Sequence, residues 1–280
     1  MIKATKKWWP LFVLPTFCAF IIGFVVPFGE GLYLSFCKFT TINKATWVGI
    51  GNYIKVFQDA QFWDSLTFTA SFTVVSTILI NVLAFAIALA LTKGIIGTNV
   101  FRTVFFMPNL IGGIVLGYIW SMIFDGLLSA YGKSILTDST WGFWGLIILM
   151  CWQQIGYMMI IYIAGLQAVP EDMLEAAKID GATGSQTLFR VIIPNVMPSI
   201  ATCTFLTLTN GFKLFDQNKA LTNGAPMNKT QMLALNIYET FYGKTGYEGV
   251  GQAKAVVFFI FVSAIAFAQL YFTRNKEVES

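Results

Sequence analysis

Six stretches of this 280-residue chain are about as long as a membrane span and contain no charged residue. They cover residues 8–29, 65–92, 103–124, 139–170, 191–212 and 255–273. A helix needs ~20 mostly apolar residues to cross the hydrocarbon core of a bilayer. The pattern therefore predicts an all-α integral membrane protein with six transmembrane helices, at about 10–35, 66–91, 103–124, 141–167, 192–212 and 252–273.

The composition excludes an ordinary soluble fold. Only 11% of the residues are charged and 56% are hydrophobic, whereas a soluble domain is about 25% charged. Disordered chains contain too few apolar residues to form a core, so this composition excludes disorder as well. We expect a single transmembrane domain over residues 1–280.

The positive charges predict which way the chain lies in the membrane. An even number of spans places both termini on one side, and short cytoplasmic segments are rich in Lys and Arg. All three Arg and several Lys lie close to the ends of the spans on the side of the termini, whereas the loops at 38–64 and 213–248 are longer and dilute their Lys. The charges on the side of the termini are Lys3, Lys6, Lys7, Lys93, Arg102, Lys178, Arg190, Arg274 and Lys276. We therefore expect both termini in the cytoplasm.

Several classes of function lack the residues they need. The chain contains no His, which excludes Ser-His-Asp triads, His-dependent zinc sites and histidine proton relays. The four Cys are widely spaced and form no CxxC pair, so we expect them to be small buried residues. The predicted spans show no group of residues that could form the catalytic site of a membrane-embedded enzyme. The net charge of +4 is too small to indicate a nucleic-acid-binding surface.

The chain also lacks the usual means of powering transport. Ion-coupled carriers normally hold ionisable residues inside the membrane, and the six uncharged runs contain none. Coupling to sodium through backbone carbonyls stays open. Gly132, Lys133 and Ser134 imitate the end of a Walker A loop, but Leu127 stands where the loop needs its first Gly. We therefore expect no bound ATP or other cofactor in this chain, and energy supplied by another subunit.

One polar segment, between the fourth and fifth runs, has the features of a short helix followed by a turn. Pro170 suits a first helical turn, and Glu171 and Asp172 place negative charge at the positive end of the helix dipole. The helix is expected to continue through 173–179, and Gly181 can adopt the left-handed conformation that ends it. A second apolar helix is expected from Leu188 to Ile193.

The short helix offers small residues to a neighbour. Ala176 and Ala177 give it a small-residue face that could seat in the groove of a partner protein. An interfacial helix without a partner is the alternative. In the third run, Gly113 and Gly117 form a GxxxG step, which would let another helix approach closely.

The polar segment resembles a known sequence motif. Glu175-Ala176-Ala177, three residues, Gly181, nine residues and then Val191-Ile192-Ile193-Pro194 are similar to the EAA loop of permease subunits in binding-protein-dependent ABC importers. In this chain the loop covers residues 169–194. Many members end the motif in I-x-L-P, from which Val191 and Ile193 depart conservatively.

Further segments resemble the maltose-permease-like sugar branch of that family. They are Trp47-x-Gly-x-Gly-Asn-Tyr53, Leu166-Gln-Ala-Val-Pro170, Asp180-Gly-Ala182, Phe212-Lys-x-Phe-Asp216 and Leu221-Thr-Asn-Gly-Ala-Pro226. Ala225 stands where Gly is usual. The resemblance extends over about residues 10–272.

The resemblance implies a type I ABC importer permease fold, with a cytoplasmic coupling helix between the fourth and fifth spans. It implies four kinds of partner: a second homologous permease, two ATPase subunits that bind ATP and Mg, an extracytoplasmic sugar-binding protein and a sugar. It also implies a multi-pass protein of the bacterial cell membrane. The residues expected to contact the ATPase are Glu175, Ala176, Ala177, Asp180 and Gly181.

The same resemblance points to a substrate path. The position matching Tyr157 contacts sugar in maltose-type subunits. Gln154 lies three residues earlier on the same helical face, and Asn210 and Thr207 pair similarly on the fifth span. For Gln154, Asn210 and Thr207, hydrogen bonding between helices is the alternative. An ion-coupled carrier and a permease for peptides or amino acids also stay open, although the latter generally lacks the signature at 212–226.

Overall fold

The structure is a computed structural model that describes residues 2–274. The described chain is mostly helical, and a short antiparallel pair, β1 (Cys37–Lys38) with β2 (Thr46–Trp47), is its sheet. It divides into two compact units, residues 1–60 with 237–259 and residues 61–236 with 260–280. That residues 1–280 form a single transmembrane domain stays a prediction. Met1 and Lys276 lie outside the described residues.

The expected all-α class is confirmed, with four to six candidate spans among the described residues. Four helices are long and apolar enough to cross a membrane by themselves: Trp9–Leu34, Ala60–Leu91, Ser139–Gln167 and Glu248–Tyr271. Two further runs form bent pairs, Thr98–Leu110 with Gly113–Ser129 at 101° and Gly184–Asn195 with Met197–Phe212 at 71°. Each of the spans predicted at 103–124 and 192–212 is thus broken into two helices, and the total of six spans stays a prediction.

Backbone chemistry explains both bends. In the first, Ile111 and Gly112 are extended, with ψ of 132° and 141°, directly after the short turn that holds Pro108. In the second, Val196 leaves helical geometry just before Pro198. Proline lacks an N–H and crowds the preceding turn, so it favours a new helix start over continuation.

The first unit joins its segments through buried polar side chains. Its elements are α1 (Ile2–Phe20), the π-helical turn η1 (Ile21–Val25), α2 (Val26–Leu34), β1, η2 (Ile42–Lys44), β2, α3 (Gly51–Gln58), the later part of α13 (Leu233–Gly243) and the first part of α14 (Glu248–Arg274). Asn52 donates to the carbonyls of Ser35 and Cys37 at 2.9 Å. Lys254, which is 1% exposed, donates to Asp59 at 2.7 Å and to Thr240 at 2.9 Å.

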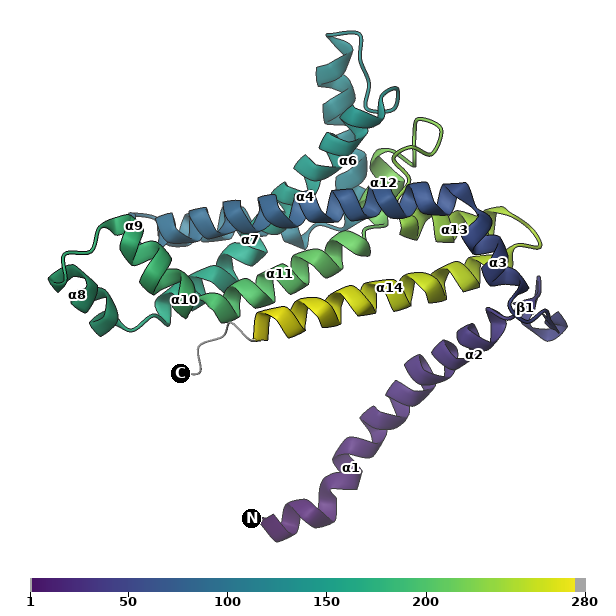
Figure 1. The fold of residues 1–280 in the computed structure, drawn as a ribbon, viewed down its shortest axis with the longest axis horizontal. Coiled ribbons are helices and arrows are strands. Elements are labelled where there is room, and N and C mark those ends of the chain that lie inside the picture. Colours follow the sequence, from purple (N-terminus) through teal and green to yellow (C-terminus); the bar gives the residue numbers. More distant parts are fainter. Residues whose placement is uncertain (1, 275–280) are drawn as a thin grey trace. The chain divides into compact units, whose positions relative to one another are not determined.

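The second unit is built around α7. Its elements are α4 (Ala60–Leu91), α5 (Thr98–Phe106), η3 (Met107–Leu110), α6 (Gly113–Ser129), α7 (Ser139–Gln167), α8 (Glu171–Ile179), α9 (Gly184–Thr187), η4 (Leu188–Ile192), α10 (Ile193–Asn195), α11 (Met197–Phe212), α12 (Asp216–Leu221), the first part of α13 and the end of α14. Figure 1 shows α4, α7 and α11 running alongside one another, with α8 to α10 at one end. The most apolar window of α7 is 67% buried, against 33% for α4, so α7 is the central helix.

Two kinds of contact hold these helices together. Tyr162 of α7 donates to Asn81 of α4 at 2.6 Å, and Asn81 donates to Thr207 of α11 at 2.9 Å. The GxxxG step works as expected: a Cβ at Gly117 would lie 2.6 Å from that of Ala220, so α12 rests directly on α6.

Gly156→Ala should destabilise the fold, because α5 crosses α7 at this glycine. An added Cβ would overlap the carbonyl group of Phe105, a backbone group that cannot rotate away. We expect a loss of about 1–3 kcal/mol, measured by thermal unfolding of the purified protein in detergent. The control is Gly126→Ala on α6, where nothing lies within 4 Å and the better helix propensity of Ala should leave stability equal or higher. Equal melting temperatures for both variants would contradict the crossing.

Candidate functional site

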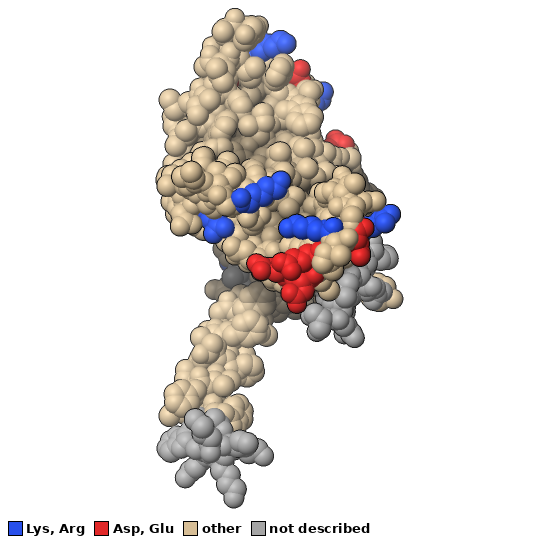
Figure 2. All heavy atoms as spheres, turned by 90° about the vertical axis from the view of Figure 1, so that its left-hand side faces the viewer, with Lys and Arg blue, Asp and Glu red and all other residues tan. Residues whose placement is uncertain are grey.

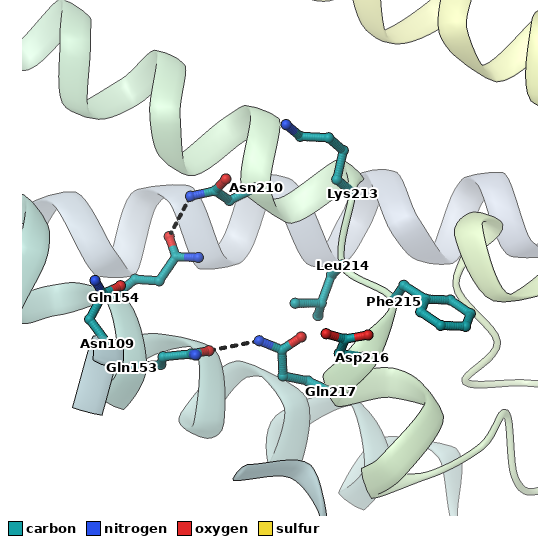
Figure 3. Close-up of a pocket in the computed structure, with 9 residues that line it drawn as sticks. All are labelled: Asn109, Gln153, Gln154, Asn210, Lys213, Leu214, Phe215, Asp216 and Gln217. Carbon is teal, nitrogen blue, oxygen red and sulfur yellow. Dashed lines mark hydrogen bonds between the residues drawn. The ribbon is translucent and has the colours of Figure 1, made fainter. Parts of the chain in front are cut away.

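A cavity of about 320 Å³ opens between α7, the end of α11 and the start of α12. Five of its lining side chains are neutral amides, and the other four come from the turn after α11 and the first residue of α12 (Figure 3). The lining residues are Asn109, Gln153, Gln154, Asn210, Lys213, Leu214, Phe215, Asp216 and Gln217. This is a polar cavity within an apolar helical bundle.

The amides are held in pairs that reach across helices. Gln217 donates to Gln153 at 2.7 Å, and Gln153 donates to the carbonyl of Ile111 at 3.2 Å. Asn210 donates to Gln154 at 3.4 Å, while the NH₂ group of Gln154 reaches the sulfur of Met150 at 3.4 Å. A thioether is a weak acceptor, so the NH₂ group of Gln154 is well placed to exchange it for a ligand oxygen.

Packing next to the cavity explains how the amides are positioned. Gln153 and Gln154 lie in the middle of α7 and are 8% and 9% exposed. Leu214 is 5% exposed and packs into the core, which anchors the turn between α11 and α12. The contact of α12 with Gly113 and Gly117 then presents Gln217 to Gln153.

The structure brings together two of the four residues predicted for the substrate path. Gln154 and Asn210 share the cavity and a hydrogen bond. Tyr157 is not among the lining residues, and its ring lies 6.4 Å from that of Phe106. Thr207 is completely buried in the network with Asn81, which favours the helix-packing alternative.

Sequence reasoning missed three of the amides. They are Asn109, Gln153 and Gln217. Gln153 and Asn109 carried a signal, because each is a polar residue inside an uncharged run. Gln217 carried none, since only the docking of α12 on α6 brings it to the cavity.

The polar segment after α7 folds as predicted from its sequence. Helix α8 begins after Pro170, has Glu171 and Asp172 in its first turn and Lys178 in its last, so its charges complement the helix dipole. Gly181 has a φ of +71°. The N–H groups of Gly181 and Ala182 donate to the carbonyls of Lys178 and Ala177 at 3.1 and 2.9 Å, which is the Schellman ending of a helix.

The next helix, α9, begins with a second set of local hydrogen bonds. The hydroxyl of Thr183 accepts from the backbone N–H of Gln186, and the Gln186 side chain accepts from the backbone N–H of Thr183. This reciprocal pair is a capping box. Because both ends of the turn 180–183 are fixed by hydrogen bonds, α8 and α9 form a stiff corner.

Four of the five predicted coupling residues are exposed, on α8 or in the turn that follows it. Glu175, Ala176, Asp180 and Gly181 are exposed. Figure 2, which looks onto this end, shows acidic side chains gathered together with Lys and Arg beside them. Ala177 is only 7% exposed and packs inward, so the expectation that Ala176 and Ala177 share one exposed face is wrong. On a nine-residue helix with one face against the core, neighbouring positions point about 100° apart.

Large apolar side chains are also exposed at this corner. Ile179 is 85% exposed and Phe189 is 66% exposed. Their exposure beside the carboxylates of α8 is typical of a surface that another protein covers. The sequence motif did not point to either residue.

Comparison with known proteins supports the resemblance noted from the sequence. Residues 83–277 match the family described as binding-protein-dependent transport system inner membrane component. The chain is 42% identical over 280 residues to the probable starch degradation products transport system permease protein AmyD of Thermoanaerobacterium thermosulfurigenes, with 97% of this chain and 96% of that protein covered. It is 31% identical to the multiple sugar-binding transport system permease protein MsmF of Streptococcus mutans, with 98% and 97% covered.

A solved structure has the same fold. It is a bacterial ABC transporter involved in the import of the acidic polysaccharide alginate, which matches with a TM-score of 0.83 at 20% sequence identity and covers 98% of both chains. At this identity the match concerns the fold alone.

Gly181→Ala should loosen the corner between α8 and α9. A side chain at a φ of +71° costs about 1–2 kcal/mol relative to Gly, so the Schellman ending should fray. Hydrogen exchange at the amides of residues 181 and 182 should quicken by roughly tenfold, since 1.4 kcal/mol is tenfold in an equilibrium constant. Gly184→Ala, at an open position three residues on, should leave both amides unchanged. Unchanged protection in Gly181→Ala would show that this glycine does not hold the corner.

Proposed function

The chain belongs to the family of binding-protein-dependent transport system inner membrane components, and on that premise we propose that it is the pore-forming permease subunit of an ATP-driven carbohydrate importer. It is a multi-pass membrane transport component and not an enzyme. The substrate class follows the relatives, whose names refer to starch degradation products and to multiple sugars. We infer an oligosaccharide or related carbohydrate for this chain.

The amide-lined cavity carries the proposal. An amide group donates and accepts hydrogen bonds at once, which suits hydroxyl groups of a neutral sugar. Lys213 and Asp216, of opposite charge, lie at the exposed edge of the cavity, so the site as a whole offers no net charge to attract an ion. Gln153, Gln154 and Asn210 are in a position to exchange their mutual hydrogen bonds for sugar hydroxyls.

The proposed assembly follows the family pattern. In it, six spans place both termini in the cytoplasm of a bacterial cell membrane, and this chain pairs with a second homologous permease. Two ATPase subunits, which bind ATP and Mg, receive α8 as the coupling helix, and an extracytoplasmic binding protein delivers the sugar. The exposed carboxylates and the exposed Ile179 at the α8 corner support a protein partner there.

The stiffness of the α8 corner supports a mechanical role. Closure of the ATPase pair would move α8 as a rigid body, because both ends of its turn are held by hydrogen bonds. The three residues between α7 and α8 include Val169, which is 8% exposed and part of the core. Movement of α8 would therefore pull on α7, and α7 carries Gln153 and Gln154.

The central test is transport by the purified complex. The tagged chain is isolated with its partners from native membranes and reconstituted in proteoliposomes with ATP inside and loaded binding protein outside. We expect ATP-dependent uptake of a labelled maltodextrin. The chain alone, with an ion gradient and no ATP, should transport nothing. Uptake by the chain alone would instead support an ion-coupled carrier.

Glu175→Lys should uncouple ATP hydrolysis from uptake. The substitution reverses an exposed charge on α8 where the ATPase is proposed to bind, and like charges across a protein contact can cost several kcal/mol. Maximal uptake should fall at least about tenfold while the chain still assembles into membranes. Tyr131→Lys, an exposed position in the loop before α7, is the control and should transport normally. Wild-type uptake by Glu175→Lys would remove the coupling role.

Gln154→Leu and Asn210→Leu should slow transport after delivery of the sugar. Each removes a hydrogen-bonding group worth roughly 1–1.5 kcal/mol, or about tenfold in rate. The measurement is the maximal uptake rate with saturating loaded binding protein, so that delivery does not limit it. Tyr157→Ala should also reduce this rate if the residue contacts sugar as the resemblance implies.

Thr207→Val separates the two roles considered for Thr207. A packing role, which its complete burial favours, predicts a loss of about 1 kcal/mol in stability with the uptake rate per folded complex unchanged. A lowered rate with unchanged stability would place Thr207 on the sugar path.

A further inference from the structure

A second cavity, of about 530 Å³, lies at the N-terminal ends of α4 and α7. It is lined by the first turns of both helices and by residues 227–229 of the loop between α12 and α13. Helix α7 has 29 residues, which at 1.5 Å per residue separates its ends by about 43 Å. This cavity and α8 are therefore at opposite ends of α7. With α8 in the cytoplasm, as proposed above, the cavity opens on the extracytoplasmic side.

The walls of the cavity combine apolar and polar groups. Phe68 and Phe143 meet edge to face with ring centroids 5.7 Å apart, and both are partly exposed. Asp64, Thr67 and Ser71 lie on the exposed stripe of α4, and their side chains form no hydrogen bond within the described chain. Their hydrogen-bonding capacity is thus available to a ligand.

The charge of the cavity favours a neutral ligand. Asp64 and Lys229 contribute one charge of each sign, and neither forms an ion pair among the residues that the structure describes. A ligand with apolar ring faces and many hydroxyls matches aromatic walls beside carboxylate, hydroxyl and ammonium groups. Carbohydrates have this combination.

The loop that closes the cavity is fixed before any ligand arrives. Asn218 donates to the carbonyl of Thr230 at 2.8 Å, and Thr230 donates to the carbonyl of Ala225 at 2.6 Å. Gln61 of α4 donates to the carbonyl of Asn228 at 3.2 Å. Between these anchors Met227 and Asn228 have φ values of 49° and 62°. Non-glycine residues held in this region are typical of ligand-binding sites, and here they present Met227 at 82% exposure on the cavity edge.

We propose that this cavity is a second carbohydrate subsite, which holds the outer part of a neutral oligosaccharide while its leading end enters the amide-lined cavity. The inference rests on the proposed function and adds chain-length selection to it. Phe143 and Gln154 are eleven residues apart on one face of α7, a separation of about 16 Å. A short sugar cannot reach both cavities, whereas a linear oligosaccharide can.

The two cavities are separate in this structure. Leu146 and Met150 lie between Phe143 and Gln154 on the same face of α7, and both are completely buried. The outer subsite can therefore be occupied independently while this apolar layer stays closed. An oligosaccharide would engage both sites only when the layer opens.

The test is to fill the outer cavity and compare a short with a long glucan. Ser71→Trp places a large side chain in the cavity from an exposed position, so the core is not disturbed. Proteoliposomes with the complete complex take up maltose or maltoheptaose with saturating loaded binding protein. We expect the maximal rate for maltoheptaose to fall about tenfold, the effect of losing roughly one good polar contact, with the rate for maltose unchanged. Asp64→Leu, which keeps the cavity open, should lower the maltoheptaose rate selectively as well.

The matched control is Ile78→Trp, two turns further along the same exposed stripe of α4 and outside the cavity. It should leave both rates unchanged. An equal fall for both sugars in Ser71→Trp, or no fall for either, overturns the subsite while wild-type uptake leaves the proposed function intact. If the wild-type complex takes up neither sugar, the proposed glucan transport and the subsite are both overturned.

Discussion

Close packing of neighbouring segments against the glycines of α7 is the contact on which the second unit depends. A Cβ at Gly156 would overlap the backbone of α5, and one at Gly165 would overlap the side chain of Ser199 on α11. At Gly142 it would lie 2.8 Å from Thr230, in the loop that borders the outer cavity. In lipid there is little hydrophobic drive between apolar helices, so close approach and van der Waals contact hold them together. Small residues along α7 make that approach possible on several sides.

This packing makes α7 a mechanical link between the sites. Its first turns line the outer cavity, its middle carries Gln153 and Gln154, and only three residues separate its end from α8. A force applied at α8 therefore reaches both cavities through one continuous helix. The bends in the neighbouring runs matter for the same reason. Each breaks its run into shorter helices, at Gly112 and Val196, and short helices can change angle against α7 without stretching their own hydrogen bonds.

Much of the fold could be predicted from the sequence, because the uncharged runs report where the chain meets lipid. An uncharged run does not indicate whether its helix is continuous, so the sequence did not predict the breaks near Pro108 and before Pro198. Features set by neighbouring residues were predicted correctly: Pro170, Glu171 and Gly181 predicted α8 and its left-handed ending. Features set by tertiary contacts were not. Gln217 becomes a cavity residue only because α12 rests on Gly113 and Gly117, and Ala177 turns inward because the core lies on that side of α8.

Lys254 bears on where the energy for transport comes from. It is an ionisable side chain, 1% exposed, inside the candidate span Glu248–Tyr271. Such residues usually mark ion or proton paths. Here its ammonium group is matched by Asp59 at 2.7 Å and by the hydroxyl of Thr240 at 2.9 Å. Breaking such a pair leaves a buried charge behind and costs several kcal/mol, so the pair is suited to fixing α14 against the end of α3 rather than to cycling its charge. Neither the neutral amides of the inner cavity nor this paired lysine is suited to carrying an ion, and both fit the proposal that energy enters through α8.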